Sequence, residues 1–309
     1  IGMISLVLWL LSMQIVLDKG QQYNWFDCAW ISWLSFFSLC AFTFFIIWES
    51  SNKNPLVNLK VFKNKNFIIG TIISTAVTMI VFTTMLLAPQ FLQNIFGYTA
   101  LLSGYTLAPR VISCVLMTFA ISPLMKVYDS RLLIAIGFLC MGLATFMFTN
   151  LNLSVSFFFV SIPNILLGVG VILTFIPVSA LVLGTLPKTE LANGSSLHNL
   201  CKTVGAAFVV SMSSTIVARH SQIHQVYLVK NLSDFSTVFQ QKISSLASIF
   251  VSDSSSMFAV NKAGSYLYKQ MLVQAKLMSY VDVFATFALL SFILIPLPFL
   301  LSLESKKED

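Results

Sequence analysis

Long apolar runs separated by short polar segments constrain this chain more than any other feature of its sequence. The first run, Ile1–Leu17, contains no charged residue. A helix of about 20 apolar residues crosses a bilayer, so each run predicts one membrane span. The runs are continuous and lack the period-two alternation of a transmembrane barrel, so we predict an all-α polytopic membrane protein. The eight predicted spans are Ile1–Leu17, Ala29–Trp48, Phe67–Leu92, Leu101–Leu124, Leu132–Phe148, Phe157–Leu186, Leu197–Val217 and Val281–Leu303.

The composition excludes a soluble protein. Charged residues make up 9% of the chain and hydrophobic residues 57%, and the mean hydropathy is +0.87. These charges are too few to cover a water-exposed surface, so lipid is the expected solvent. The net charge is +7, but Lys and Arg are scattered among short loops, which argues against a nucleic-acid partner. The 5 cysteines show no CxxC or metal-ligand spacing, and we expect no metal and no cofactor.

The chain begins inside its first apolar run, without an initiator Met or a basic lead-in. A cleaved signal peptide would need that basic region and a small-residue cleavage site. We therefore interpret the chain as part of a longer protein, of which an upstream portion is not in this sequence.

The loops alternate in charge along the chain. The segments after the second, fourth, sixth and eighth runs carry Lys or Arg, whereas Gln93–Ala100 and Thr149–Ser156 carry no charge. Short Lys- and Arg-rich loops stay in the cytoplasm. The C-terminus and, by the even number of spans, Ile1 are therefore predicted to be cytoplasmic. Pro55–Phe67 mixes apolar residues with Lys and is interpreted as an interfacial segment on the inner leaflet.

The segment 220–280 is predicted to be a long extracytoplasmic loop with two amphipathic helices. The first covers Phe235–Phe250, with Ser233 and Asp234 as N-caps, and the second runs from Ala263 to Lys276. Two interpretations stay open. The helices pack on each other and on the span ends, or they bind a periplasmic adaptor protein or lie in the interface.

Few ionisable residues lie within the spans, where their cost makes them functional candidates. Arg110 follows Gly104 and Pro109 in the fourth span. It either anchors a cavity wall or acts as a counter-charge for a carboxylate elsewhere, or it reaches an interface or satisfies a neighbouring carbonyl. Lys202 either snorkels to the cytoplasmic interface or takes part in gating. His198 is interpreted mainly as an interfacial polar residue. Asp282 opens the last span, as a helix-start residue or as a coupling group.

Three neutral polar residues, Gln90, Gln93 and Asn164, are candidates for the substrate pathway, because amides in spans either bond across helices or line a cavity. Gly168 with Gly170, and Gly205, predict close helix contacts. No Asp or Glu lies in the middle of a predicted span, so a complete proton relay is not visible. The sequence also lacks HExxH, GxSxG and Walker A motifs.

Four groups of short motifs occur in the same order as in a known transporter family. The chain resembles the second part of the fourteen-span drug:proton antiporters of the EmrB/QacA type, in the major facilitator superfamily. The motifs span nearly the whole chain. They are Leu17–Gly20 with Asn24–Phe26; Asn54–Phe62 with Asn66–Phe67; Gly97–Ala100 with Gly104 and Pro109–Arg110; and Leu186–Pro187 with Ala192–Ser196 and Asn199.

The resemblance implies a domain organisation and a mechanism. Residues 1–48 would be a linker helix pair, 49–66 a cytoplasmic interfacial segment, and 67–309 the C-terminal six-helix bundle, built from two inverted repeats. The family's motifs for the first bundle, and the acidic residue that some relatives carry in the span of Arg110, are absent here. Two bundles would rock around a midplane site in a bacterial inner membrane. They would export apolar or cationic drugs or toxic compounds, driven by the proton gradient.

Two other classes of protein remain as alternatives. A truncated, non-transporting membrane scaffold would fit the start of the chain. An integral membrane transferase would need clustered Asp, Glu or His at one membrane face. The histidines are His198, His220 and His224, and His198 is predicted to face the opposite side from the other two, which disfavours a transferase.

Overall fold

The computed structural model describes residues 1–52, 58–150, 157–230, 237–250 and 256–301. In these ranges the chain is helical and contains no strand. The main helices are α1 Gly2–Gly20, α2 Ala29–Ser51, α3 Lys65–Phe96, α4 Ala100–Val127, α5 Ser130–Thr149, α6 Phe157–Gly184, α7 Leu191–Val229, α8 Thr237–Phe250 and α9 Ser256–Ile293. Short 3₁₀ turns lie at Gln21–Tyr23, Trp25–Asp27, Leu59–Lys63 and Leu297–Leu300. The all-α prediction is therefore confirmed.

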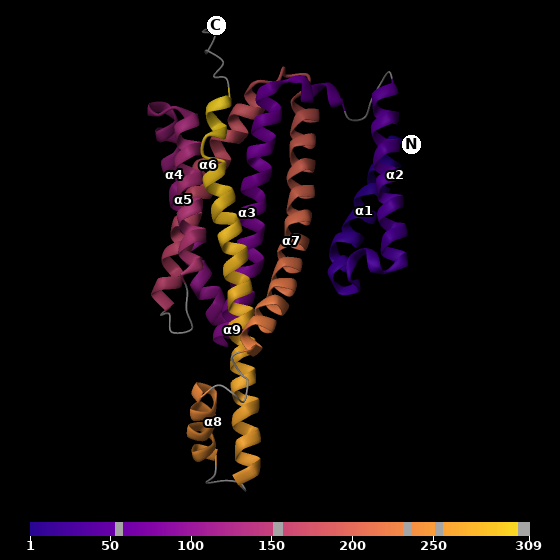
Figure 1. Cartoon of the computed structure of the whole chain (residues 1–309). Coiled ribbons are helices and arrows are strands. Elements are labelled where there is room, and N and C mark those ends of the chain that lie inside the picture. The colour runs from indigo at the N-terminus through magenta and orange to yellow at the C-terminus, as the bar shows by residue number, and fades with distance from the viewer. Residues whose placement is uncertain (53–57, 151–156, 231–236, 251–255, 302–309) are drawn as a thin grey trace.

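Eight helices in the described residues are long and apolar enough to cross a membrane. Successive helices run in opposite directions, so the ends of α2, α4, α6 and α9 lie at one end of the molecule and those of α1, α3, α5 and α7 nearer the other (Figure 1). This alternation agrees with the predicted span order. Which end faces the cytoplasm stays a prediction.

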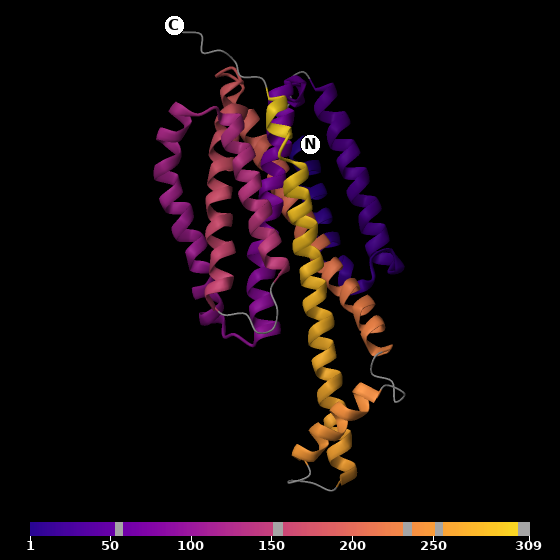
Figure 2. The same ribbon diagram turned by 60° about the vertical axis from the view of Figure 1, so that its left-hand side comes forward.

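The core lies among α3, α5, α6, α7 and α9. Aromatic rings fill one end of it: Phe91 contacts Tyr280 and Phe284, and Phe148 stacks on Phe284 with ring centroids 5.0 Å apart. These rings are fully buried. Helix α4 lies at the edge of the bundle against α6 and exposes most of its surface, as expected of a helix that faces lipid (Figure 2).

Helices α1 and α2 form a hairpin that stands beside the bundle next to α7 (Figure 1). The Ser211 hydroxyl donates to the Leu17 carbonyl at 2.7 Å and joins the hairpin to α7. The predicted division into a linker pair and a six-helix bundle is compatible with this arrangement and stays a prediction.

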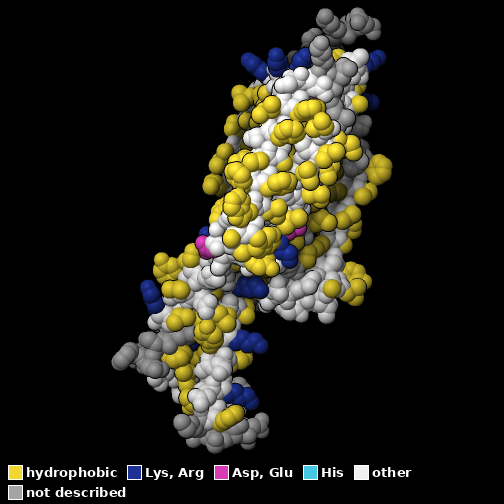
Figure 3. All heavy atoms as spheres, turned by 90° about the vertical axis from the view of Figure 1, so that its right-hand side faces the viewer, with side chains coloured by type: hydrophobic (Ala, Val, Ile, Leu, Met, Phe, Trp, Pro, Cys, Tyr) yellow, Lys and Arg dark blue, Asp and Glu magenta, His cyan; other side chains and the backbone are white. Residues whose placement is uncertain are grey.

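Apolar side chains cover the body of the molecule (Figure 3). Lys and Arg gather at its upper rim and along the narrow extension below it, which is made by α8 and the first half of α9 (Figures 1 and 3). This distribution fits a body in lipid and an extension in water.

The Gly97–Ala100 motif makes the tight turn between α3 and α4. Gly97 ends α3 in the left-handed conformation, at φ +67°, which a residue without Cβ adopts without strain. Two residues later, the Thr99 hydroxyl accepts the backbone N–H of Leu102 and caps α4.

Helices α5 and α6 approach closely through glycine. A Cβ placed on Gly170 would lie 2.7 Å from the Gly137 carbonyl oxygen, and one placed on Gly137 would lie 2.8 Å from that of Gly170. The close contact predicted for the Gly168–Gly170 segment is therefore confirmed.

The segment 220–280 differs from the predicted long loop. Helix α7 continues to Val229, and α9 begins at Ser256 and runs without a break into the last span. The helix predicted at Ala263–Lys276 is therefore not a separate element. The prediction placed the helix ends where the apolar sequence ends. The polar sequence beyond remains helical, and no Pro occurs between residues 188 and 295 to interrupt it.

The first predicted extramembrane helix is present as α8, Thr237–Phe250. It packs on α9 through Ala247, Ala259 and Ala263. The proposed caps Ser233 and Asp234 lie outside the described residues, as do residues 53–57 at the start of the predicted interfacial segment. Helix α8 and the first half of α9 extend away from the bundle and do not cover the span ends (Figure 2).

The candidate last span reaches Leu300, close to the predicted boundary at Leu303, but its last part is not regular α-helix. Helix α9 stops at Ile293, and Pro296 leads a 3₁₀ turn over Leu297–Leu300. Proline lacks the amide hydrogen that a continuing helix needs.

Candidate functional site

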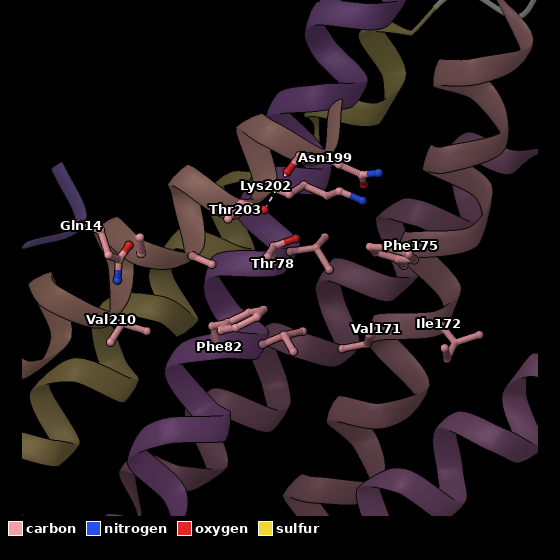
Figure 4. Close-up of a pocket in the computed structure, with 14 residues that line it drawn as sticks. Gln14, Thr78, Phe82, Val171, Ile172, Phe175, Asn199, Lys202, Thr203 and Val210 are labelled. Carbon is pink, nitrogen blue, oxygen red and sulfur yellow. Dashed lines mark hydrogen bonds between the residues drawn. The ribbon is translucent and has the colours of Figure 1, made fainter. Parts of the chain in front are cut away.

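A cavity of about 650 Å³ opens between α3, α6 and α7, with one residue from α1 at its edge (Figure 4). Its walls are mainly aliphatic and aromatic, and such walls with few polar groups are typical of small-molecule sites. The lining residues are Gln14; Val77, Thr78, Val81 and Phe82; Val171, Ile172 and Phe175; and Asn199, Lys202, Thr203, Ala206, Ala207 and Val210.

Lys202 is the single ionisable residue among those that line this cavity. Its side chain extends from α7 toward α6, and its ammonium lies 4.8 Å from the centroid of the Phe175 ring (Figure 4). A cation over an aromatic face is held electrostatically. Lys202 therefore gives the apolar cavity a localised positive charge.

Arg110 lies between α4 and α3 and does not line the cavity. Its Nη2 donates to the Thr84 hydroxyl at 2.7 Å, whereas its buried Nε has no hydrogen-bond partner in the described structure. Within the described ranges Arg110 forms no ion pair. A buried cation without a carboxylate is costly.

The three candidate amides do not converge on one site. Asn164 is buried, and its side-chain N–H donates to the Thr106 carbonyl at 3.4 Å, which joins α6 to α4. Gln93 donates to the Ser103 hydroxyl at 3.1 Å and joins α3 to α4. Gln90 lines another cavity, of about 600 Å³, nearer the C-terminal end of α3. Of the six predicted site residues, Lys202 alone lines the first cavity.

Asp282 lies well inside α9, so the prediction that it starts a helix is wrong. The helix begins 26 residues before Asp282 and includes the polar sequence upstream of the span. The Asp282 carboxylate contacts two imidazoles of α7: its Oδ2 lies 2.7 Å from His220 Nδ1 and 2.7 Å from His224 Nε2. Sequence reasoning missed this cluster. The i, i+4 spacing of His220 and His224 was the available signal.

His198 is buried in the helix bundle, and its Nδ1 lies 3.1 Å from the Thr71 hydroxyl of α3. Its position at the membrane interface stays a prediction. The turns around it in α7 pack against α3, so the ring lies between two helices and away from solvent.

Two of the sequence motifs meet at one end of the bundle. The Asn193 side chain accepts the backbone N–H of Asn58 at 3.0 Å and donates to the Asn58 carbonyl at 3.0 Å. Asn64 caps α3 and donates to the Thr185 carbonyl at 3.3 Å. These bonds hold the segment before α3 against the connection between α6 and α7, 135 residues away in the chain.

In the part of the chain that the structure describes, eight apolar helices, a core among five of them and a mostly apolar cavity define an integral membrane protein of the helical-bundle class. A family model described as Major Facilitator Superfamily matches residues 1–210, and the chain belongs to this family. Its members are transporters and not enzymes.

Curated relatives agree with this assignment. The chain is 32% identical over 248 residues to the probable multidrug resistance protein EmrY of Escherichia coli (strain K12), covering 77% of this chain and 47% of the relative. It is 27% identical to the multidrug export protein EmrB of the same organism, covering 92% and 54%. It is 26% identical to the fatty acid resistance protein FarB of Neisseria gonorrhoeae, covering 97% and 58%. The chain thus spans about half the length of these relatives.

Proposed function

We propose that this chain is the second half of a proton-driven efflux transporter that exports drug-like compounds from a bacterial inner membrane by alternating access. The family membership and the names of EmrY and EmrB support the transport of drugs. The cavity between α3, α6 and α7 supports a binding site within this half, because its volume falls in the range of about 300–1,000 Å³ typical of ligand pockets.

The observation that carries the proposal is the charge in this cavity. Its walls are suited to an apolar body, while Lys202 attracts an anionic group and repels a cation. Of the apolar and cationic compounds that the resemblance implies, the apolar ones fit this half. We therefore propose amphipathic substrates with an apolar body and an acidic or strongly polar head. The name of the relative FarB refers to fatty acid resistance, and a fatty acid has an apolar body and an acidic head.

The proton step is assigned to the other half of the transporter. No Asp or Glu lines the cavity, so a proton acceptor must come from elsewhere. In this proposal Lys202 acts at the substrate and Arg110 serves as a counter-charge in the wall between α3 and α4. Gln90, Gln93 and Asn164 hold neighbouring helices or line the end of the pathway.

The extension formed by α8 and the first half of α9 is proposed as the contact for a periplasmic adaptor. Helix α8 packs on α9 through small residues, so part of the apolar surface of both helices is buried between them. Large apolar side chains remain exposed on both, including Ile249 and Phe258. Exposed apolar residues outside the lipid region are typical of interaction sites.

The test is efflux by the protein expressed from its complete coding sequence in cells that lack other drug exporters. Lys202→Ala removes the cavity charge. Lys230→Ala is the matched control, because Lys230 also lies over an aromatic ring, that of Tyr227 at 5.4 Å, but outside this cavity. Efflux of a fluorescent acidic amphiphile and of a cationic dye is measured in parallel.

We expect Lys202→Ala to weaken export of the acidic compound by about tenfold, the effect of losing roughly 1.5 kcal/mol from a charged hydrogen bond. Export of the cationic dye should stay the same or increase. Equal loss for both compounds, or no loss for either, would contradict the proposed role of this cavity.

A further inference from the structure

A cluster of three ligand-type side chains joins α7 to α9 at the base of the extension. His220 and His224 are four residues apart on α7, so both rings leave the same face of the helix. Asp282 faces them from α9, 62 and 58 residues away along the chain. The proposed transport function uses none of the three.

The three groups converge on one point. Both imidazole nitrogens lie 2.7 Å from the same carboxylate oxygen, Asp282 Oδ2. The two rings are steeply inclined, at 72°, with centroids 6.3 Å apart, so their nitrogens approach from different directions. The three ligand atoms all lie within 4.8 Å of one another. Three ligand atoms this close together, on side chains from two helices, can be drawn around one metal ion.

We propose that His220, His224 and Asp282 form a Zn²⁺ site that joins α7 to α9. Two imidazoles and one carboxylate are ligands that Zn²⁺ accepts, with a fourth, open position left for water. Ca²⁺ and Mg²⁺ prefer all-oxygen ligands, so this set disfavours them. The ligands are His220 Nδ1, His224 Nε2 and Asp282 Oδ2.

Zn²⁺ binding requires the three side chains to rearrange. Tetrahedral ligands at about 2.0–2.1 Å from Zn²⁺ are roughly 3.3 Å apart, so each nitrogen must move away from Oδ2 by about 0.6 Å. The two nitrogens, which lie within 4.8 Å of each other, must also approach to that spacing. Rotation of these partly exposed side chains can supply both movements. In the metal-free cluster each nitrogen donates a hydrogen to Oδ2; when Zn²⁺ binds, each neutral ring carries its hydrogen on the other nitrogen.

Solvent reaches all three ligands. The exposed fractions of the side chains are 43% for His220, 24% for His224 and 36% for Asp282, so an ion has an entry path. In each ring, the nitrogen that does not bind Zn²⁺ can donate its hydrogen to water, which stabilises the tautomer needed for metal binding. On the predicted topology the site faces outside the cell, and it would take Zn²⁺ from there.

The test is Zn²⁺ binding to the purified protein in detergent after treatment with a chelator. We expect Zn²⁺ to raise the melting temperature at pH 7.5, and Co²⁺ to give the visible absorption of a four-coordinate site. Ca²⁺ and Mg²⁺ at the same concentration should do neither.

The informative variant is the double change His220→Gln and His224→Gln. Glutamine keeps an N–H donor for Asp282 but is a poor Zn²⁺ ligand. We expect at least about 100-fold weaker Zn²⁺ binding with the metal-free melting temperature little changed. Gln222→Ala, on the turn between the two histidines, is the matched control and should bind as the unmodified protein does.

The double variant keeps all free cysteines, so weak residual binding measures any contribution from them. Zn²⁺ affinity that is unchanged in the double variant would overturn the proposal, and so would the absence of Zn²⁺ binding to the unmodified protein. The readout is metal binding and not efflux, so this result is independent of the proposed transport function.

Discussion

The contact between α5 and α6 can be tested by adding a single methyl group. In Gly170→Ala the new Cβ would lie 2.7 Å from the Gly137 carbonyl oxygen, 2.8 Å from Met141 Cγ and 3.0 Å from Met141 N. Two of these atoms belong to the backbone of α5, so the helices must separate by several tenths of an ångström. Overpacking of this kind costs about 1–3 kcal/mol.

Part of that cost is offset, because alanine is more favourable than glycine in a helix by about 0.5–1 kcal/mol. The expected net loss in the free energy of unfolding is therefore about 1–2 kcal/mol. For a chain of this size that corresponds to a fall in melting temperature of roughly 2–8 °C.

The assay is thermal unfolding of the purified protein in detergent, followed by intrinsic fluorescence. Gly104→Ala in α4 is the matched control, because nothing lies within 4 Å of its added Cβ. It should keep or slightly raise the melting temperature. If Gly170→Ala and Gly104→Ala melt at the same temperature, then α5 and α6 are not in close backbone contact and the packing argument fails.

Two further predictions concern Arg110 and the orientation of the chain. Arg110→Ala in the complete protein should lower efflux severalfold without preventing membrane insertion, whereas Arg110→Lys should retain part of the activity by keeping the charge; unchanged drug accumulation in Arg110→Ala would remove Arg110 from the transport mechanism. For orientation, single cysteines at Lys60 and Ser245 in a cysteine-free background should react with membrane-impermeant reagent only from inside and only from outside the cell, respectively, and the reverse pattern would invert the predicted topology.

The spans could be predicted from the sequence because a bilayer demands about 20 apolar residues per crossing. The predicted boundaries lie close to those of α1 to α6. They fail for α7 and α9, whose polar ends at Val229 and Ser256 remain helical in the extension. Hydropathy predicts which residues prefer lipid, but it does not predict how far a helix continues into polar sequence.

The site was harder to predict than the fold. Lys202 could be singled out because a cation within a span is costly, but its position over Phe175 depends on how α7 packs against α6. The cluster around Asp282 depends on the register between α7 and α9, which are separated by α8. The register between these two helices cannot be predicted from a single sequence.

The continuity of α9 gives the molecule a mechanical property. A helix rises about 1.5 Å per residue, so Ser256 lies about 39 Å along the axis from Asp282. A tilt of the span by about 10° would carry the far end of the helix sideways by roughly 7 Å. A small tilt of the span would therefore be amplified into a large displacement at the other end of α9, as in a lever.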